Sequence, residues 1–228
     1  KGGATGSAEV TLTVKPNTPP TVTLTQPTQG ATFTAPATIE LAAEATDPDG
    51  VGMTKVEFFQ LDPDPTKPPK RLGGDTSAPY HFTWRNVEAG TYTLRAVATD
   101  KGGATGSAEV TLTVKPNTPP TVTWLSPTAG ATFPAPATIP LEVTAADPDG
   151  VGITAVEFFQ GDQSLRRDVS APYTFTWRNV PAGTYILRAL ATDKGTATTE
   201  ATITITVGPA PPANQPPLVA PPAPPRPP

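Results

Sequence analysis

Acidic residues recur at matching places along this chain and are its best candidates for chemistry. The segment DPDG occurs twice, and a further aspartate follows a run of alternating apolar residues in each half. With an asparagine from the proline-rich stretch before each half, the oxygen-bearing set comprises Asp47, Asp49, Asp100 and Asn17, and then Asp147, Asp149, Asp193 and Asn117. Ca²⁺ takes six to eight such oxygens at roughly 2.3–2.6 Å. DPDG alone also satisfies a type I turn, with proline second and glycine fourth. Both interpretations stand, and the spacing does not fit an EF-hand loop.

Catalytic groups are scarce in this sequence. The single histidine, His81, lies between strand residues and is replaced by Thr174 in the second half. No serine lies in a nucleophile-elbow pattern, no histidine-rich zinc spacing exists, and the chain has no cysteine for a thiolate site. We therefore expect no enzyme activity and no required cofactor, with Ca²⁺ as the one candidate ligand.

Aromatic residues offer a second candidate surface. Phe58 and Phe158 take the inward phase of their strands, which leaves Phe59 and Phe159 on the outer face. We expect Arg95 and Arg188 beside them, each in a cross-strand pair with Glu57 or Glu157. Such a group is either ordinary packing on a sheet surface or a contact for a glycan or protein partner. The tryptophans alternate in phase with core residues, and we expect Trp84, Trp177 and Trp124 in the core or at its edge.

An internal repeat sets the organisation. Residues 1–20 recur letter for letter as residues 101–120, and the similarity continues beyond that block. A period of about 100 residues is the size of one small domain rather than of a solenoid repeat. The net charge of −4 gives no basic footprint for nucleic acid, and no apolar run approaches the ~18 residues of a membrane span.

Each half contains segments that alternate apolar and polar residues with a period of two, separated by turn signals such as PTQG, DPDG, LGGD and DKGG. About seven short strands per unit, with no helical period, predict an all-β chain of tandem β-sandwiches. An odd number of strands would place the two ends of each unit at opposite ends of the sandwich.

The segments EAGTYTL and PAGTYIL place Tyr92 and Tyr185 where a tyrosine corner occurs in immunoglobulin-like sandwiches. With NTPPTVT, DPDG, KVEFFQ and GGATGSAEVTLTV, they give a chain that resembles the bacterial Ig-like domain family, which occurs in tandem in secreted or surface-anchored proteins. The resemblance implies that the DPDG loop, the loop after the sixth strand and the incoming linker share one end of each sandwich. The loop LDPDPTKPPKRLGGD departs from its shorter counterpart GDQSLRRD and is expected to be a surface insertion.

Four regions are predicted from these patterns: 1–17, 18–117, 118–207 and 208–228. Residues 18–117 and 118–207 form the two immunoglobulin-like domains. Residues 1–17 carry the sequence of a closing strand, which either finishes a preceding repeat or pairs with another chain. The proline-rich region 208–228 predicts polyproline II, serving as a spacer or as a ligand for a partner.

The sequence thus predicts an extracellular or cell-surface structural spacer that projects another module, with neighbouring repeats or copies of itself as partners. A surface filament built by strand exchange and a carbohydrate- or protein-binding adhesive module are the alternatives. Neither nucleic-acid binding nor membrane insertion is expected.

Overall fold

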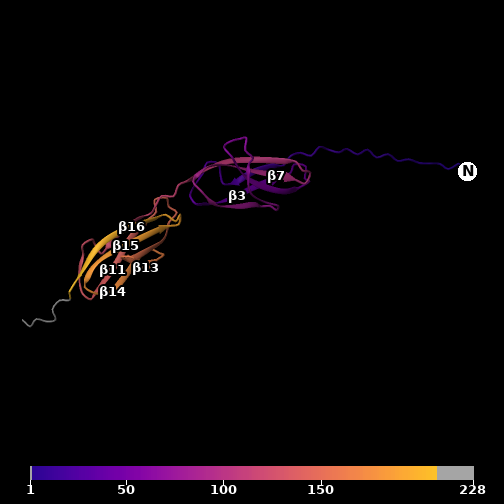
Figure 1. The fold of residues 1–228 in the computed structure, drawn as a ribbon. Coiled ribbons are helices and arrows are strands. Elements are labelled where there is room, and N and C mark those ends of the chain that lie inside the picture. Colours follow the sequence, from indigo (N-terminus) through magenta and orange to yellow (C-terminus); the bar gives the residue numbers. More distant parts are fainter. Residues whose placement is uncertain (1, 210–228) are drawn as a thin grey trace, which may run out of the picture. The chain divides into compact units, whose positions relative to one another are not determined.

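The structure, a computed structural model, describes residues 2–209 and contains sixteen β-strands in that range (Figure 1). The chain divides into two compact units, Lys1–Pro116 and Asn117–Pro228. Within residues 2–209 there is no helix long and apolar enough to cross a membrane. The expectation of polyproline II for the proline-rich tail falls on 210–228, outside the described residues.

Each unit is a sandwich of one three-stranded and one five-stranded sheet. In unit 1 the sheets have the orders β1-β3-β6 and β2-β8-β7-β4-β5. The bounds are β1 Thr21–Gln26, β2 Ala31–Thr34, β3 Ala37–Thr46, β4 Met53–Leu61, β5 Lys70–Asp75, β6 Tyr80–Val87, β7 Gly90–Asp100 and β8 Thr105–Lys115.

Unit 2 repeats this topology, with the orders β9-β11-β14 and β10-β16-β15-β12-β13. Its strands are β9 Thr121–Ser126, β10 Thr132–Pro134, β11 Ala137–Ala146, β12 Ile153–Gln160, β13 Gln163–Asp168, β14 Tyr173–Val180, β15 Gly183–Asp193 and β16 Thr198–Gly208. The tandem all-β sandwich predicted from the alternation is therefore confirmed.

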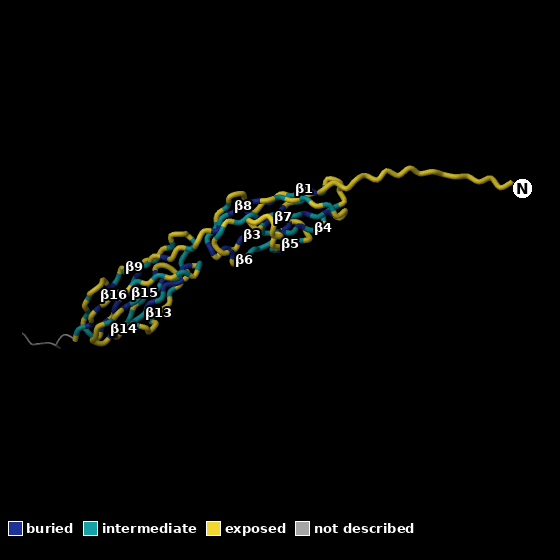
Figure 2. Tube along the Cα trace, turned by 45° about the horizontal axis from the view of Figure 1, so that its top comes forward, coloured by how far each residue is buried: buried dark blue, intermediate teal, exposed yellow. Residues whose placement is uncertain are grey.

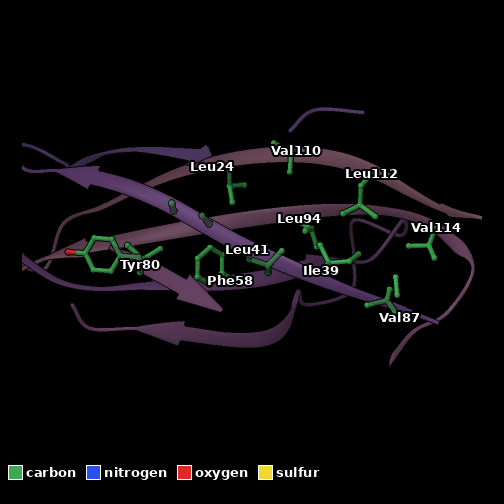
Figure 3. Close-up of a cluster of buried hydrophobic side chains, with 14 of the residues drawn as sticks. Leu24, Ile39, Leu41, Phe58, Tyr80, Val87, Leu94, Val110, Leu112 and Val114 are labelled. Atoms are coloured by element: carbon green, nitrogen blue, oxygen red, sulfur yellow. The ribbon is translucent and has the colours of Figure 1, made fainter. Parts of the chain in front are cut away.

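The core of each unit lies between its two sheets (Figures 2 and 3). Ile39 and Leu41 of β3 face Phe58 and Leu94 of the other sheet, and none of the four exposes more than 1% of its surface. Trp84, Trp124 and Trp177 pack against these cores while staying partly exposed, as predicted. Trp124 also donates its Nε1–H to the carbonyl of Ala201 at 3.1 Å.

The tyrosine corners form as predicted. The Tyr92 hydroxyl donates to the carbonyl of Glu88 at 2.8 Å, and the Tyr185 hydroxyl donates to that of Pro181 at 2.9 Å. Each ring also meets a tryptophan edge to face, Trp84 at 5.1 Å and Trp177 at 5.0 Å between centroids. The corner therefore fixes the start of β7 or β15 to the turn before it.

Two expectations about strands were wrong. The segment LGGD, taken as a turn, lies inside edge strand β5, and most of GDQSLRRD forms β13. These strands pair through the backbone with β4 and β12. The alternation of β5 is interrupted by Gly73, which lies against the Phe82 ring, where any Cβ would come within 2.3 Å of it. Strands β2 and β10 were also missed, because each is only three or four residues long.

The ends of each unit lie where the sequence predicted, although the strand count was wrong. Each unit has eight strands, but β2 runs parallel to β8, and β10 runs parallel to β16. The first strand and the short strand that follows it therefore act together as one edge strand. Its first part belongs to one sheet, and its second part belongs to the other. In unit 1 the chain enters beside Asp100, where β8 begins, and leaves at Lys115, where β8 ends.

A candidate linker latch

Two loops from different sheets hold the segment that leads into each unit. The loop after β3, residues 47–52, follows the three-stranded sheet, and Asp100 ends β7 of the five-stranded sheet. Asn17 and Thr18 contact one loop each. We call this group the linker latch; in unit 2 its members are Asn117, Thr118, Asp147, Asp149 and Asp193.

The buried carboxylate is the centre of the latch. Asp100 and Asp193 are each 1% exposed. Asp100 Oδ2 accepts from Asn17 Nδ2 at 2.9 Å, and Asp100 Oδ1 accepts from the backbone N–H of Ala104 at 2.9 Å. A buried carboxylate is stable only when its oxygens are hydrogen-bonded, so both contacts are needed.

The same geometry recurs in unit 2. Asp193 accepts from Asn117 Nδ2 and from the backbone N–H of Ala197, both at 2.9 Å. Both repeats therefore fix the amide of the linker asparagine to the end of a central strand.

A second contact fixes the next residue of the linker. The backbone N–H of Thr18 donates to Asp49 Oδ2, and that of Thr118 donates to Asp149 Oδ2. In unit 1 the Thr18 hydroxyl adds a hydrogen bond of 3.1 Å to Asp49 Oδ1. Adjacent linker residues are thus joined to loops from both sheets of one sandwich.

The first aspartate of DPDG shapes the loop. Asp47 accepts from the backbone N–H of Asp49 at 2.9 Å and from that of Gly52 at 2.8 Å. The Gly50 N–H donates to the Asp47 carbonyl at 3.2 Å, closing the turn. Asp147 makes the same contacts in unit 2. This is the hydrogen-bonded turn that the segment DPDG predicts.

The glycine two residues after each buried aspartate makes room for the asparagine. A Cβ at Gly102 would lie 2.4 Å from Asn17 Nδ2, and one at Gly195 would lie 2.4 Å from Asn117 Cγ. Sequence reasoning identified the aspartates and asparagines but missed these glycines and the threonines. The glycines lie within the turn signal DKGG and its counterpart DKGT, but their packing role depends on where the linker lies.

The carboxylates of the latch accept hydrogen bonds from protein donors. Within residues 2–209 no three histidine, aspartate or glutamate side chains are grouped so as to hold a metal ion. The Asn117 Oδ1 atom is buried without a donor among the described residues. Calcium binding remains one of the two predictions for these aspartates.

The outer aromatic face differs from the expected pairing. Phe59 lies opposite Arg95, and Phe159 lies opposite Arg188, as the register requires. Within the described residues, however, the expected Glu57–Arg95 pair is replaced by others. Glu57 pairs with Lys55 and Arg71, each at 2.8 Å, and Arg95 pairs with Glu109 at 2.6 Å. Strand β5, which the sequence did not reveal, supplies Arg71.

In unit 2 an arginine covers the aromatic ring. The Arg188 guanidinium carbon lies 5.1 Å from the Phe159 ring centroid, and its Nη atoms contact Glu200 at 2.8 Å and Asp162 at 3.1 Å. Glu157, expected as its partner, instead accepts from the Ser164 hydroxyl at 2.6 Å. The hydrogen bond from Arg188 lowers the pKa of Glu200, and the hydrogen bond to Glu200 raises the pKa of Arg188. This ring is held in a cation–π and ion-pair cluster.

No curated protein sequence matches the chain. Among solved structures, fibronectin(III)-like modules of Clostridium thermocellum CbhA are 27% identical, with 83% of this chain and 95% of that chain covered and a TM-score of 0.42. Titin domains Z1Z2 in complex with telethonin are 17% identical, with 86% and 99% covered and a TM-score of 0.33.

A family model described as a bacterial Ig domain matches residues 20–96 and 120–207. The first region runs from β1 into β7, the second covers nearly all of the strands of unit 2, and together they take in most of the chain. The chain therefore belongs to the bacterial Ig domain family.

Proposed function

We propose that this chain is a non-catalytic, extracellular spacer that holds another module at a distance from a surface. The observation that carries the proposal is the linker latch, which occurs in both units with the same partners and nearly the same distances. Domains of this family are typical of secreted and surface proteins and are generally non-catalytic, which agrees with such a role.

A spacer needs a defined direction of the chain as it enters each unit. Two flexible linker residues would otherwise swivel freely about their φ and ψ angles. The Asn117–Asp193 and Thr118–Asp149 hydrogen bonds remove that freedom at the entry to unit 2. The prolines on either side, Pro116 and Pro119, restrict φ further.

A spacer also needs each unit to add length. The chain enters unit 1 at the Asp100 end and leaves at the other end of β8, an eleven-residue strand. At a rise of about 3.3 Å per residue, such a strand carries the chain about 35 Å. Each unit therefore adds a comparable length to the path.

A force that pulls on the two ends of a unit would act on strands whose hydrogen bonds resist it. The parallel pairing of β2 with β8 joins a strand from the N-terminal part of unit 1 to the end of its last strand, where the chain leaves. Hydrogen bonds from the Gly30 N–H to the Thr111 carbonyl at 2.8 Å and from the Ala35 N–H to the Lys115 carbonyl at 2.9 Å flank this pair. Pulling at the two ends of unit 1 shears these bonds together, and unit 2 has the same arrangement through β10 and β16.

Force spectroscopy on the 228-residue chain tests the proposal. Two separate unfolding events are expected, each lengthening the chain by about 300 Å, which is the extension of some 95 residues less the folded length. Extension without force peaks would contradict a load-bearing spacer. Specific glycan binding that is lost in Phe59→Ala/Phe159→Ala would instead establish the adhesive alternative.

A further inference from the structure

Unit 1 has a hollow on its surface that a longer loop builds. In unit 1 the eight residues 62–69 join β4 to β5, whereas in unit 2 only Gly161 and Asp162 join β12 to β13. The hollow has a volume of about 250 Å³ and is lined by Leu61, Asp62, Pro65, Lys67, Pro69 and Arg95. We call it the loop pocket.

Hydrogen bonds within the loop hold its shape. The backbone N–H of Asp64 donates to Asp62 Oδ1 at 2.9 Å, and the backbone N–H and hydroxyl of Thr66 donate to Asp64 Oδ1 at 3.0 and 2.7 Å. The backbone N–H of Lys67 donates to the Asp64 carbonyl at 3.1 Å. Four prolines in 62–69 restrict φ as well. The walls of the loop pocket are therefore set before a ligand binds.

The arginine of the loop pocket keeps a donor that its counterpart uses. In unit 2, Arg188 Nη1 donates twice to the two-residue turn, at 3.1 Å each, and Nη2 donates to Glu200 at 2.8 Å. In unit 1, Arg95 contacts Glu109 through Nε at 2.7 Å and through Nη2 at 2.6 Å. The longer loop takes the place of the turn that holds Nη1. Within residues 2–209, Arg95 Nη1 is thus left without an acceptor.

A second cation lines the loop pocket. Lys67 Nζ lies 3.7 Å from Asp62 Oδ2, and the Lys67 side chain is 61% exposed. That separation is beyond the roughly 2.7–3.2 Å of a hydrogen bond, and an exposed ion pair of this kind contributes little to stability. The ammonium group can therefore turn to a better acceptor, and Asp62 Oδ2 can then accept from a ligand donor.

We infer that the loop pocket binds a sugar acid, such as one uronic acid unit of an acidic polysaccharide. The ligand carboxylate would accept from Arg95 Nη1 and Lys67 Nζ, because charge-assisted hydrogen bonds are the strong ones. The ligand hydroxyl groups would donate to Asp62 Oδ2, and its C–H groups would lie against Leu61 and the proline rings.

The composition and size of the loop pocket select this class of ligand. An uncharged sugar leaves both cations without an anion, and a simple carboxylate leaves Asp62 without a donor. A volume of about 250 Å³ is just below the roughly 300 Å³ of the smallest drug-sized sites, which suits a single sugar ring.

NMR titration of the full chain with sodium D-glucuronate tests the inference, with D-glucose and sodium acetate as separate probes at matched ionic strength. Glucuronate should shift the amide signals of 61–69 and the Nε–H signal of Arg95. The Nε–H signal of Arg188 should stay in place, because the donors of Arg188 are already occupied. Glucose should cause no shifts, and acetate should bind about tenfold more weakly than glucuronate.

Variants separate the loop pocket from the general charge of the chain. Lys67→Gln should weaken glucuronate binding about tenfold, and Lys194→Gln, the same change of charge in unit 2, should leave it unchanged. Glu109→Gln, which releases Arg95 from its ion pair, should raise the affinity. Replacement of 62–69 by Gly-Asp, the turn with which unit 2 folds, should abolish binding.

No shift in the signals of 61–69 on addition of glucuronate would overturn the inference, as would binding that persists after the loop is replaced. Equal affinities for acetate and glucuronate would overturn the assignment to a sugar acid, because Asp62 would then contribute nothing. The spacer proposal does not depend on the loop pocket, since the linker latch consists of other residues.

Discussion

The side-chain amide of Asn117 donates to the buried carboxylate of Asp193 at 2.9 Å. The same amide packs against Gly195, which has no side chain to displace it. Asn17, Asp100 and Gly102 have the same relationship in unit 1. A linker residue is thus built into the surface of the unit that follows it.

Gly195→Ala should destabilise unit 2 by about 2 kcal/mol, because the new Cβ would lie 2.4 Å from Asn117 Cγ and displace the amide from a buried carboxylate. Gly195 does not have a positive φ, so its backbone accepts alanine. In an Asn117→Ala background, Gly195→Ala should reduce the free energy of unfolding by at least about 1 kcal/mol less than it does in the wild type. Urea denaturation of the four members of this cycle measures the coupling, and equal costs in both backgrounds would show that the asparagine is not what Gly195 accommodates.

Thr196 has a left-handed backbone, with φ 75°, where unit 1 has Gly103 with φ 89°. A β-branched residue is strained in this region by about 1–2 kcal/mol. Thr196→Gly should therefore stabilise unit 2 by about 1 kcal/mol. This is the strain relieved less the entropic cost of ordering a glycine on folding. Calorimetry should show a rise in Tm of about 4–8 °C for that unit, and the reverse change, Gly103→Thr, should lower the Tm of unit 1. A Tm that does not rise in Thr196→Gly would contradict strain at this residue.

Glu200 should make unit 2 sensitive to acid. Its pKa is lowered in the folded state, chiefly by the hydrogen bond from Arg188. The unfolded chain therefore binds the proton more readily, and the stabilisation is complete above the ordinary glutamate pKa of about 4.3 and is lost as pH falls below it. Glu200→Gln should flatten the pH dependence of unfolding between about pH 5 and 3.

Tryptophan fluorescence in a Trp84→Phe background reports unit 2, because Trp124 and Trp177 both lie there. Glu109→Gln, which removes the partner of Arg95 in unit 1, is the matched control and should leave this signal unchanged. An unaltered acid profile in Glu200→Gln would contradict the assignment.

The addition of Ca²⁺ distinguishes between the two interpretations of the repeated aspartates, a calcium site and a turn. A cation at 100 times its Kd would stabilise the folded unit by about 2.7 kcal/mol, which corresponds to a rise in Tm of 10 °C or more. The backbone donors that already occupy Asp47, Asp49 and Asp100 lead us to expect a change below about 1 °C when Ca²⁺ is added to chelator-treated protein. A larger rise, absent in Asp193→Asn/Asp100→Asn, would establish a calcium site.

The fold followed from local patterns, whereas the pairing of side chains did not. Alternation in β7 and β15 predicts the burial of Leu94 and Leu187 without knowledge of the partner strand. The partners of Arg95 and Glu57 depend on register and on β5, whose Gly73 and Gly74 conceal a strand. The latch could be predicted in part, because its aspartates repeat. Thr118, however, donates through its backbone N–H, which no residue type reveals.

The most direct test of the spacer is the distribution of distances between its two units. The chain has no cysteine, so Thr23→Cys and Thr174→Cys, exposed positions on β1 and β14, place one spin label in each unit. Pulsed electron–electron double resonance should give a narrow distribution for the labelled wild type. Thr118→Ala, which keeps the backbone N–H that Asp149 accepts, should leave it narrow. Asn117→Ala should broaden it. A wild-type distribution as broad as that of Asn117→Ala would contradict the claim that the latch fixes the entry of the linker.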